Sequence, residues 1–301
     1  MIHHIVANTN ITSMNNILTD NLDYNRPIKI AEDVYWVGFN DPERGLHCNP
    51  YLILEGQEAI LIDGGSRPEF SRVMMKIMQT GVEPSRISTL IYHHYDPDLC
   101  GSLPNLEDII DRRDLRIISQ HENNVFIRYY AVRSEMLCIK RMGYAMTFAS
   151  GRRLRFIPTP YSHAQGAFMT LDEKTGILFS SDIFGSFHVE NARWNLFQEF
   201  SQSCQHCTQA LHHGQHCTTT NIHCELASII AFHREIMTSN AALRYAIQQI
   251  RALKPRMIAP QHGSVFYRAQ DINIVIERLL TLDDVGIDGF LQQERRNLES
   301  I

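Results

Sequence analysis

Three side chains that commonly bind metal ions alternate along five residues of this 301-residue chain. His94, Asp96 and Asp98 come directly after the apolar segment 89–92. Alternate side chains of an extended or tightly turning segment lie on the same side, so these three can face one point. Imidazole and carboxylate ligands together suit Fe, Zn or Mn better than Ca or Mg. The alternative interpretation is a solvated loop at a strand end, in which the Asp residues serve as turn residues around Pro97.

Three further residues of the same chemistry lie where apolar segments end, namely His163, Asp182 and His262. A single His or Asp at a strand end is more often structural than ligating, so none of them is specific by itself. Functional groups lie on loops at strand ends because strand interiors are buried. The order, types and spacing of all six residues together favour a metal site.

The apolar patterning predicts the elements that position these residues. A β-hairpin is predicted over residues 51–62, around a Gly-containing turn. Helical spacing predicts three helices: from Ser66 as N-cap to Gly81, over 122–142, and over 240–253 with Ser239 or Asn240 as N-cap. The order of elements is two β-rich halves, each of which closes with helices.

These motifs resemble the metallo-β-lactamase superfamily and, more closely, the diiron domain of flavodiiron proteins. The first motif of that domain is His-x-Glu-x-Asp-His-x-Gly, which here reads His94-x-Asp96-x-Asp98-Leu99-x-Gly101. Family-like segments at 49–53, 61–63, 239–245 and 258–264 extend the resemblance over roughly residues 30–280. It implies an α/β (α+β) fold of the metallo-β-lactamase type, an αββα sandwich of two mixed sheets flanked by helices.

The resemblance also implies two iron ions, with zinc as the alternative, and assigns the ligands. One iron would take His94, Asp96 and His163. The other would take Asp98 and His262, and Asp182 would bridge the pair.

Two residues depart from the flavodiiron pattern. Asp96 stands where the family has Glu, and Leu99 stands where it has a ligating His. The second iron therefore has an open position for water, O₂ or a substituted ligand, or it binds more weakly. For the neighbouring His93 and Cys100 we expect core or hydrogen-bonding roles.

Stand-alone or sensor-fused relatives of this domain are oxygen-binding diiron proteins, so the resemblance implies O₂ binding for O₂ or redox sensing, as in the sensory part of a signalling protein. Flavodiiron enzymes carry a flavodoxin domain with FMN, and no such FMN domain is expected after His262. The alternatives are an O₂ or NO reductase module that needs an external electron donor, and a dinuclear zinc hydrolase. A scaffold with a degenerate site is disfavoured because six ligand positions are chemically competent. Whether the chain is an enzyme stays open.

A Cys- and His-rich stretch at about residues 200–226 looks like an insertion relative to the family. Its cysteines, Cys204, Cys207, Cys217 and Cys224, have the spacing C-x₂-C-x₉-C-x₆-C. A C-x₂-C pair is a common half-site for Zn or an Fe–S cluster. A redox-labile dithiol and a polar insertion with incidental cysteines are the alternatives.

Composition sets the remaining expectations. A net charge of −5 without a basic stripe argues against nucleic-acid binding. No apolar run reaches the ~18 residues of a membrane span, and no secretory signal is visible, so a cytoplasmic protein is expected. We divide the chain into an N-terminal extension (1–30), the metal-binding domain (31–285) and a helical tail (286–301). A homodimer and a redox partner or downstream signalling domain are expected from the resemblance.

Overall fold

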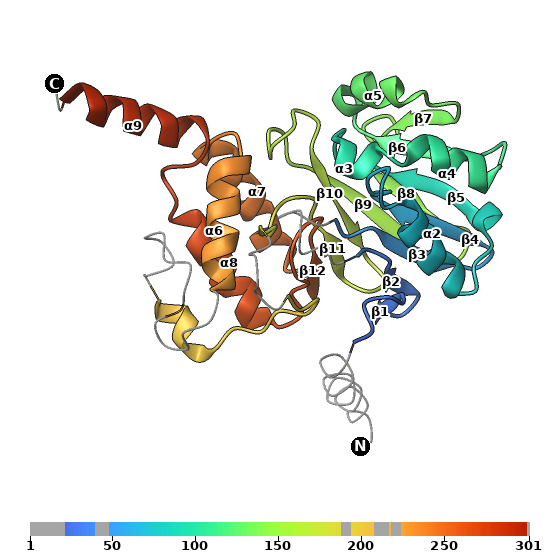
Figure 1. Ribbon diagram of the computed structural model, residues 1–301, viewed down its shortest axis with the longest axis horizontal. Coiled ribbons are helices and arrows are strands. Elements are labelled where there is room, and N and C mark those ends of the chain that lie inside the picture. Colours follow the sequence, from blue (N-terminus) through green and yellow to red (C-terminus); the bar gives the residue numbers. More distant parts are fainter. Residues whose placement is uncertain (1–21, 40–47, 188–193, 208–216, 218–223, 300–301) are drawn as a thin grey trace, which may run out of the picture.

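Two β-sheets pack face to face between two layers of helices in the computed structural model, which describes residues 22–39, 48–187, 194–207, 217 and 224–299 (Figure 1). The first sheet contains, in spatial order, β1 (Ile28–Ala31), β2 (Val34–Trp36), β3 (Tyr51–Glu55), β4 (Glu58–Ile62), β5 (Ile87–Ile91), β6 (Arg116–Ser119) and β7 (Glu135–Cys138). The second contains β12 (Met257–Ala259), β11 (Ile177–Phe179), β10 (Phe168–Asp172), β9 (Arg153–Pro158) and β8 (Ala145–Thr147). Both sheets mix parallel and antiparallel pairs, which confirms the predicted sandwich.

Each sheet carries its own helices on its outer face (Figure 1). The first is covered by α2 (Phe70–Gln79), α3 (Pro97–Cys100), α4 (Leu103–Ile110) and α5 (His121–Ile127). The second is covered by α6 (Glu225–Ile236), α7 (Asn240–Leu253) and α8 (Ala269–Leu280). Short 3₁₀ turns lie at η1 (Pro84–Arg86), η2 (Arg128–Tyr130) and η3 (Gln202–His206), and α9 (Ile287–Glu299) projects from the body.

Three apolar clusters fill the spaces between these layers. The middle one joins the two sheets, with large aromatic side chains such as Trp36, Tyr51 and Phe168 at its centre. Because each sheet is covered on both faces, its inner strands are apolar on both sides rather than alternating. In β5 all five residues are buried for this reason. The rigid strand ends that result are what position the polar loops described below.

Local sequence signals explain several element boundaries. The β3–β4 hairpin turns at Gly56, whose φ of +57° favours glycine. The Oγ of Ser239 accepts a hydrogen bond from the Ala242 N–H at 3.2 Å and caps α7, as predicted. The predicted cap at Ser66 is wrong, because α2 begins after Glu69 without a side-chain cap.

The predicted helix over 122–142 is confirmed at its start and wrong beyond Tyr130. Helix α5 ends at Ile127, Ala131 adopts a left-handed φ of 58°, and the chain then enters β7. Strand β7 pairs in parallel with β6, where Glu135 lies opposite Arg116. Pairing with an existing sheet edge outweighs the helical spacing of the apolar residues here.

Candidate metal centre

All six predicted ligands lie at one edge of the sandwich, on loops that follow strands. Strands β9, β11 and β12 run in the same direction, since β10 is antiparallel to β9 and β11 while β12 is parallel to β11. Their carboxyl ends therefore meet at one edge, where His163, Asp182 and His262 follow them. From the other sheet, β5 leads to His94 and then to α3, which carries Asp98.

Asp182 lies at the centre of this arrangement and contacts imidazoles from three loops. Its Oδ2 lies 2.9 Å from the Nε2 of His163, and its Oδ1 lies 3.2 Å from the Nε2 of His94. The Nε2 of His262 lies 3.5 Å from Oδ1. The side chain of Asp182 is only 3% exposed. The carboxylate predicted to bridge two metals therefore has neighbours from both predicted ligand groups.

His94, Asp96 and His163 form the first ligand group, and their ligand atoms all lie within 4.8 Å of one another. The Oδ2 of Asp96 lies 3.3 Å from the Nε2 of His163 and 3.6 Å from the Nδ1 of His94. Within the described part of the chain, that Nδ1 is a buried polar atom without a hydrogen-bond partner. A buried nitrogen of this kind is expected to have a partner, and a metal ion would supply one.

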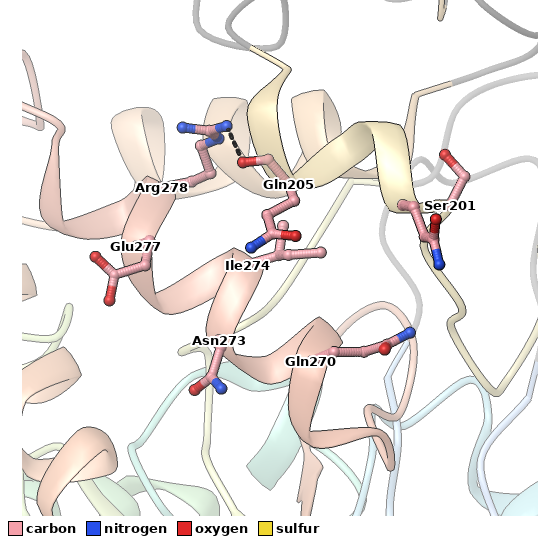
Figure 2. A pocket seen from close by; sticks show the side chains of 8 residues that line it. Ser201, Gln205, Gln270, Asn273, Ile274, Glu277 and Arg278 are labelled. Atoms are coloured by element: carbon pink, nitrogen blue, oxygen red, sulfur yellow. Dashed lines mark hydrogen bonds between the residues drawn. The ribbon is translucent and has the colours of Figure 1, made fainter.

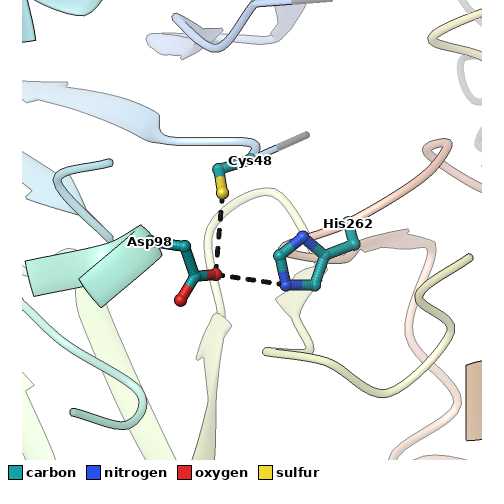
Figure 3. A group of neighbouring side chains, drawn as sticks. All are labelled: Cys48, Asp98 and His262. Atoms are coloured by element: carbon teal, nitrogen blue, oxygen red, sulfur yellow. Dashed lines mark hydrogen bonds and ion pairs between the residues drawn. The ribbon is translucent and has the colours of Figure 1, made fainter. Parts of the chain in front are cut away.

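Asp98 and His262 form the second group, with a residue that was not predicted, Cys48. The Oδ2 of Asp98 lies 3.3 Å from the Nε2 of His262 and 3.6 Å from the Sγ of Cys48 (Figure 3). Leu99 is fully buried in the apolar cluster beneath the first sheet, as a residue that cannot ligate should be. Cys48 was not predicted because it comes just before a strand, whereas the predicted ligands were residues that follow a strand.

The imidazoles and carboxylates of the site stabilise each other's charged forms. Although burial alone would lower the pKa of His94, the Asp182 carboxylate raises it to about 9. Burial would raise the pKa of Asp182, but the imidazoles of His94 and His163 bring it well below its ordinary value. The Asp98 carboxylate of the second group is held ionised in the same way, since the hydrogen bond from His262 overcomes burial and lowers the pKa of Asp98. A cation that binds here must displace the imidazole protons, so metal affinity falls as the pH drops.

The donor set fits a metal pair. Ligand atoms about 2.0–2.3 Å from a common ion lie about 3–3.8 Å from one another. The separations of Asp96 from His94 and His163, and of Asp98 from His262 and Cys48, are 3.3–3.6 Å and fall in that range. Imidazole, carboxylate and thiol are the ligands that iron and zinc accept. The residues present therefore suit two such ions held on either side of Asp182.

Residues behind the ligands hold them in place. The ring of His93 points away from the site, with its Nδ1 2.7 Å from Asp63 and its Nε2 3.0 Å from Thr170. The thiol of Cys100 donates to the backbone oxygen of His94 at 3.5 Å. Both residues have the hydrogen-bonding roles that were predicted for them.

Asn49 ties the strand that follows Cys48 to the loop that carries His262. Its side-chain amide donates to the backbone oxygens of Pro260 and Gly263 at 3.1 and 2.9 Å, and its oxygen accepts from the Trp36 indole at 2.8 Å. Asn49 lies in the family-like segment 49–53, but its hydrogen bonds to a loop more than two hundred residues later could not be predicted from a local pattern.

Replacing Asn49 with Ala is expected to destabilise the fold by about 3 kcal/mol, because several buried polar groups lose their partners at once. Metal binding at the His262 side should weaken as well. Chemical denaturation and metal titration measure the two effects. The exposed Asn273→Ala variant serves as control and should stay within ~0.5 kcal/mol of wild type. An equal loss in both variants would contradict the role given to Asn49.

His233 in α6 lies behind the Asp182 loop as a neutral, buried imidazole. Its Nε2 accepts a hydrogen bond from the Phe184 N–H at 3.1 Å, and its Nδ1 lies 2.7 Å from the Ile229 oxygen. Burial lowers the pKa of His233 from 6.5 to about 4.

His233 therefore predicts acid sensitivity. Its pKa is lower in the folded than in the unfolded state, so the unfolded state binds more protons between about pH 6.5 and 4. The contribution of neutral His233 to the free energy of unfolding is complete above pH 6.5. It declines by about 3 kcal/mol as the pH falls through that window. His233→Gln, which can make both hydrogen bonds without titrating, should flatten this loss in denaturation series from pH 7 to 4. The exposed His121→Gln variant should keep the wild-type slope; a wild-type slope in His233→Gln would contradict the assignment.

The Cys- and His-rich stretch is described only in part, since 208–216 and 218–223 lie outside the described residues. Its four cysteines form no disulfide with one another in the described part of the chain, and all four are partly buried. Burial raises the pKa of Cys224, and the nearby sulfurs of Cys204, Cys207 and Cys217 raise it further. The structure therefore brings the four thiols into one neighbourhood. The described ligand groups that converge within 4.8 Å are those of the two metal positions, so these thiols are near one another without forming a closed set.

A polar hollow of about 240 Å³ lies between η3 and α8 (Figure 2). Arg278 closes one side of it by donating to the backbone oxygen of Gln205 at 2.8 Å. It shares no lining residue with the metal centre.

None of the described helices has both the length and the hydropathy that a membrane span needs.

The sequence matches one family model and is similar to known proteins over about half of its length. Residues 46–263 match the model of a family described as ODP family beta lactamase. A flavo-diiron protein of Clostridium acetobutylicum is 26% identical over 176 residues, which cover 54% of this chain and 43% of that protein. A nitric oxide reductase of Moorella thermoacetica is 23% identical over 189 residues, which cover 56% and 45%. The chain thus spans less than half the length of these curated relatives.

Solved structures extend the likeness to nearly the whole fold. The apo state of the chemotaxis sensor ODP from T. denticola superposes with a TM-score of 0.68 at 25% identity, covering 89% of this chain and 97% of that one. Rubredoxin oxygen:oxidoreductase from Desulfovibrio gigas superposes with a TM-score of 0.66 at 16% identity. That match covers 85% of this chain and 61% of the oxidoreductase.

Proposed function

The chain belongs to the ODP family of β-lactamases, and from this premise we propose that it is a non-haem diiron domain that binds O₂ for O₂ or redox sensing. The observation that carries the proposal is the position of Asp182, whose carboxylate contacts imidazoles of both ligand groups. The likeness to a chemotaxis sensor along 97% of that sensor's chain supports the sensory role.

The ligand assignment follows from the two groups. One iron would be held by His94, Asp96 and His163 and the other by Asp98 and His262, and Asp182 would serve both. An iron pair with carboxylate and imidazole ligands supplies open coordination positions and electrons for O₂. The protein contributes a buried inner wall, and leaves Asp96 and Asp98 partly exposed, at 32% and 26% of their side chains. O₂ reaches the site from this exposed side.

Iron is favoured over zinc by one ligand. Asp96 places a carboxylate where the superfamily's hydrolases use a second imidazole, and hard oxygen ligands favour iron that reacts with O₂. Leu99 lacks an imidazole that is usual in those hydrolases, but the flavodiiron pattern has a His at the same position, so Leu99 does not separate the two metals. A dinuclear zinc hydrolase is therefore the weaker alternative, although its ligands overlap.

An O₂ or NO reductase that takes electrons from an external donor is the stronger alternative. It is supported by the curated relatives, which include a flavo-diiron protein and a nitric oxide reductase. Two outcomes separate the candidates when O₂ is added to the reduced, iron-loaded protein. A visible absorption band that persists for many minutes and reverses on removal of O₂ supports the sensor. A band that decays while an added electron donor is consumed over many turnovers supports the reductase.

For the four-cysteine neighbourhood we propose a second metal site, with zinc preferred over an Fe–S cluster. Four thiolates with a C-x₂-C half-site are a common structural zinc set. A bound ion would draw the four sulfurs together. Double replacement of Cys204 and Cys207 with Ser should then lower the zinc content by one ion per chain without changing the iron content. Unchanged zinc in that variant would remove the basis for the site.

The remaining expectations are also proposals. A homodimer and a redox partner or a downstream signalling domain rest on the resemblance, and a cytoplasmic location rests on the sequence, which shows no membrane span and no secretory signal. Helix α9 exposes Ile287, Phe290, Leu291 and Leu298, all more than 45% exposed. These exposed apolar side chains make the tail suited to contact another protein surface.

A further inference from the structure

The second metal position has fewer assigned ligands than the first. Asp98 and His262 supply two protein ligands besides the shared Asp182, and Leu99 offers only hydrocarbon. Cys48 lies where a third ligand would be expected, in one group with Asp98 and His262 whose ligand atoms are within 4.8 Å of one another. Figure 3 shows the three side chains converging from separate parts of the chain, the segment before β3, helix α3 and the loop after β12.

We propose that Cys48 binds the metal ion of the second position through its Sγ and takes the coordination place that Leu99 leaves empty. This inference rests on the proposed function in placing a metal between Asp98 and His262, and it holds for iron or zinc alike. The Sγ lies 3.6 Å from the Oδ2 of Asp98, which is itself 3.3 Å from the Nε2 of His262. Three ligands about 2.0–2.3 Å from one ion have separations of this size.

The backbone around Cys48 is built to hold it there. Cys48 is 4% exposed, and the next residue donates its backbone N–H to the Gln261 oxygen at 2.8 Å. The Asn49 side chain adds two hydrogen bonds to the same loop. The segment that carries the thiol is thus fastened to the loop that carries His262, so sulfur and imidazole keep a fixed separation.

Binding is a proton exchange in which no electron is transferred. The thiol S–H bond breaks, the sulfur keeps the electron pair and forms the bond to the divalent ion, and the proton leaves to solvent. Thiolate is a soft ligand that suits iron and zinc and disfavours magnesium or calcium. A thiolate from Cys48 would therefore favour iron or zinc at the second position and would not affect which metal binds at the first.

The test uses the full chain with Cys204→Ser, Cys207→Ser, Cys217→Ser and Cys224→Ser, so that the second cysteine neighbourhood does not contribute sulfur ligands. Loaded with Co²⁺ alone, this protein should show the near-ultraviolet thiolate-to-cobalt absorption of one cobalt–sulfur bond. Adding Cys48→Ser should abolish that absorption and weaken one of the two cobalt sites at least tenfold. Adding Cys138→Ser, a thiol away from the site that donates to Gln120, should change neither.

X-ray absorption on the zinc-loaded background protein provides a test that needs no variant at Cys48. One sulfur neighbour for every two bound zinc ions, at about 2.3 Å from one of them, is expected. Two bound metals without a sulfur neighbour, or cobalt absorption that survives Cys48→Ser, would overturn the proposal. Sulfur ligation in a protein isolated with zinc would keep this proposal and contradict only the iron function.

Discussion

An Asp182→Asn variant is expected to lose both metal ions rather than one. Asp182 contacts His94, His163 and His262 within 3.5 Å, so it belongs to both ligand groups. Asparagine keeps the shape but removes the charge, and its NH₂ group cannot bind a metal as the lost oxygen did. Losing even an outer-shell partner weakens metal binding roughly 10–100-fold, and a shared inner ligand should cost more at each position.

Metal content after dialysis against a weak chelator measures this effect. Wild type should retain two ions at this centre, and Asp182→Asn should retain fewer than one. An Asp114→Asn variant is a matched control, because that carboxylate pairs with Arg112 on the surface. Retention of one tightly bound ion in Asp182→Asn would mean that the carboxylate serves a single metal, and would contradict its bridging role.

Arg152→Ala is expected to cost the fold about 3–5 kcal/mol, the usual penalty for leaving buried charges without their partner. The Arg152 side chain is 1% exposed and forms a bidentate pair with Asp172, at 3.1 and 2.6 Å. It also contacts Glu55 at 3.1 Å and the backbone oxygen of Leu54 at 3.2 Å. One guanidinium therefore joins the ends of β3 and β10, which belong to different sheets.

Arg153 provides the matched control one residue away. Its side chain is 46% exposed and lies 3.4 Å from Glu173, so Arg153→Ala should cost less than ~1 kcal/mol. Free energies of unfolding from denaturant titration, with an unchanged denaturant dependence, compare the two. Similar losses in both variants would mean that Arg152 does not link the sheets energetically.

The sequence was most informative where one residue type had one physical meaning. Alternating ligand types after an apolar strand predicted the positions of His94, Asp96 and Asp98, because strand ends are where polar groups reach the surface. The cap at Ser239 was predicted because its hydroxyl has a local partner three residues away. The sandwich itself followed from the family resemblance rather than from periodicity.

Contacts between segments that are distant in the chain could not be predicted from local sequence patterns. Cys48 lies fifty residues before Asp98, and only the fold brings its sulfur within 3.6 Å of that carboxylate. The same holds for Asn49, which is tied to a loop 211 residues away. The strand at β7 was mistaken for a helix since its partner, β6, is not visible in a local pattern. The ligand roles themselves stay a prediction until a metal is measured.

Metal analysis of protein purified without air distinguishes an iron pair from a zinc pair. In the Cys204→Ser, Cys207→Ser background, we expect about two irons per chain and little zinc, and fewer than one iron once Asp182→Asn is added. Two zinc ions per chain, with iron absent even after anaerobic loading with Fe²⁺, would contradict the diiron proposal and return the protein to the hydrolases.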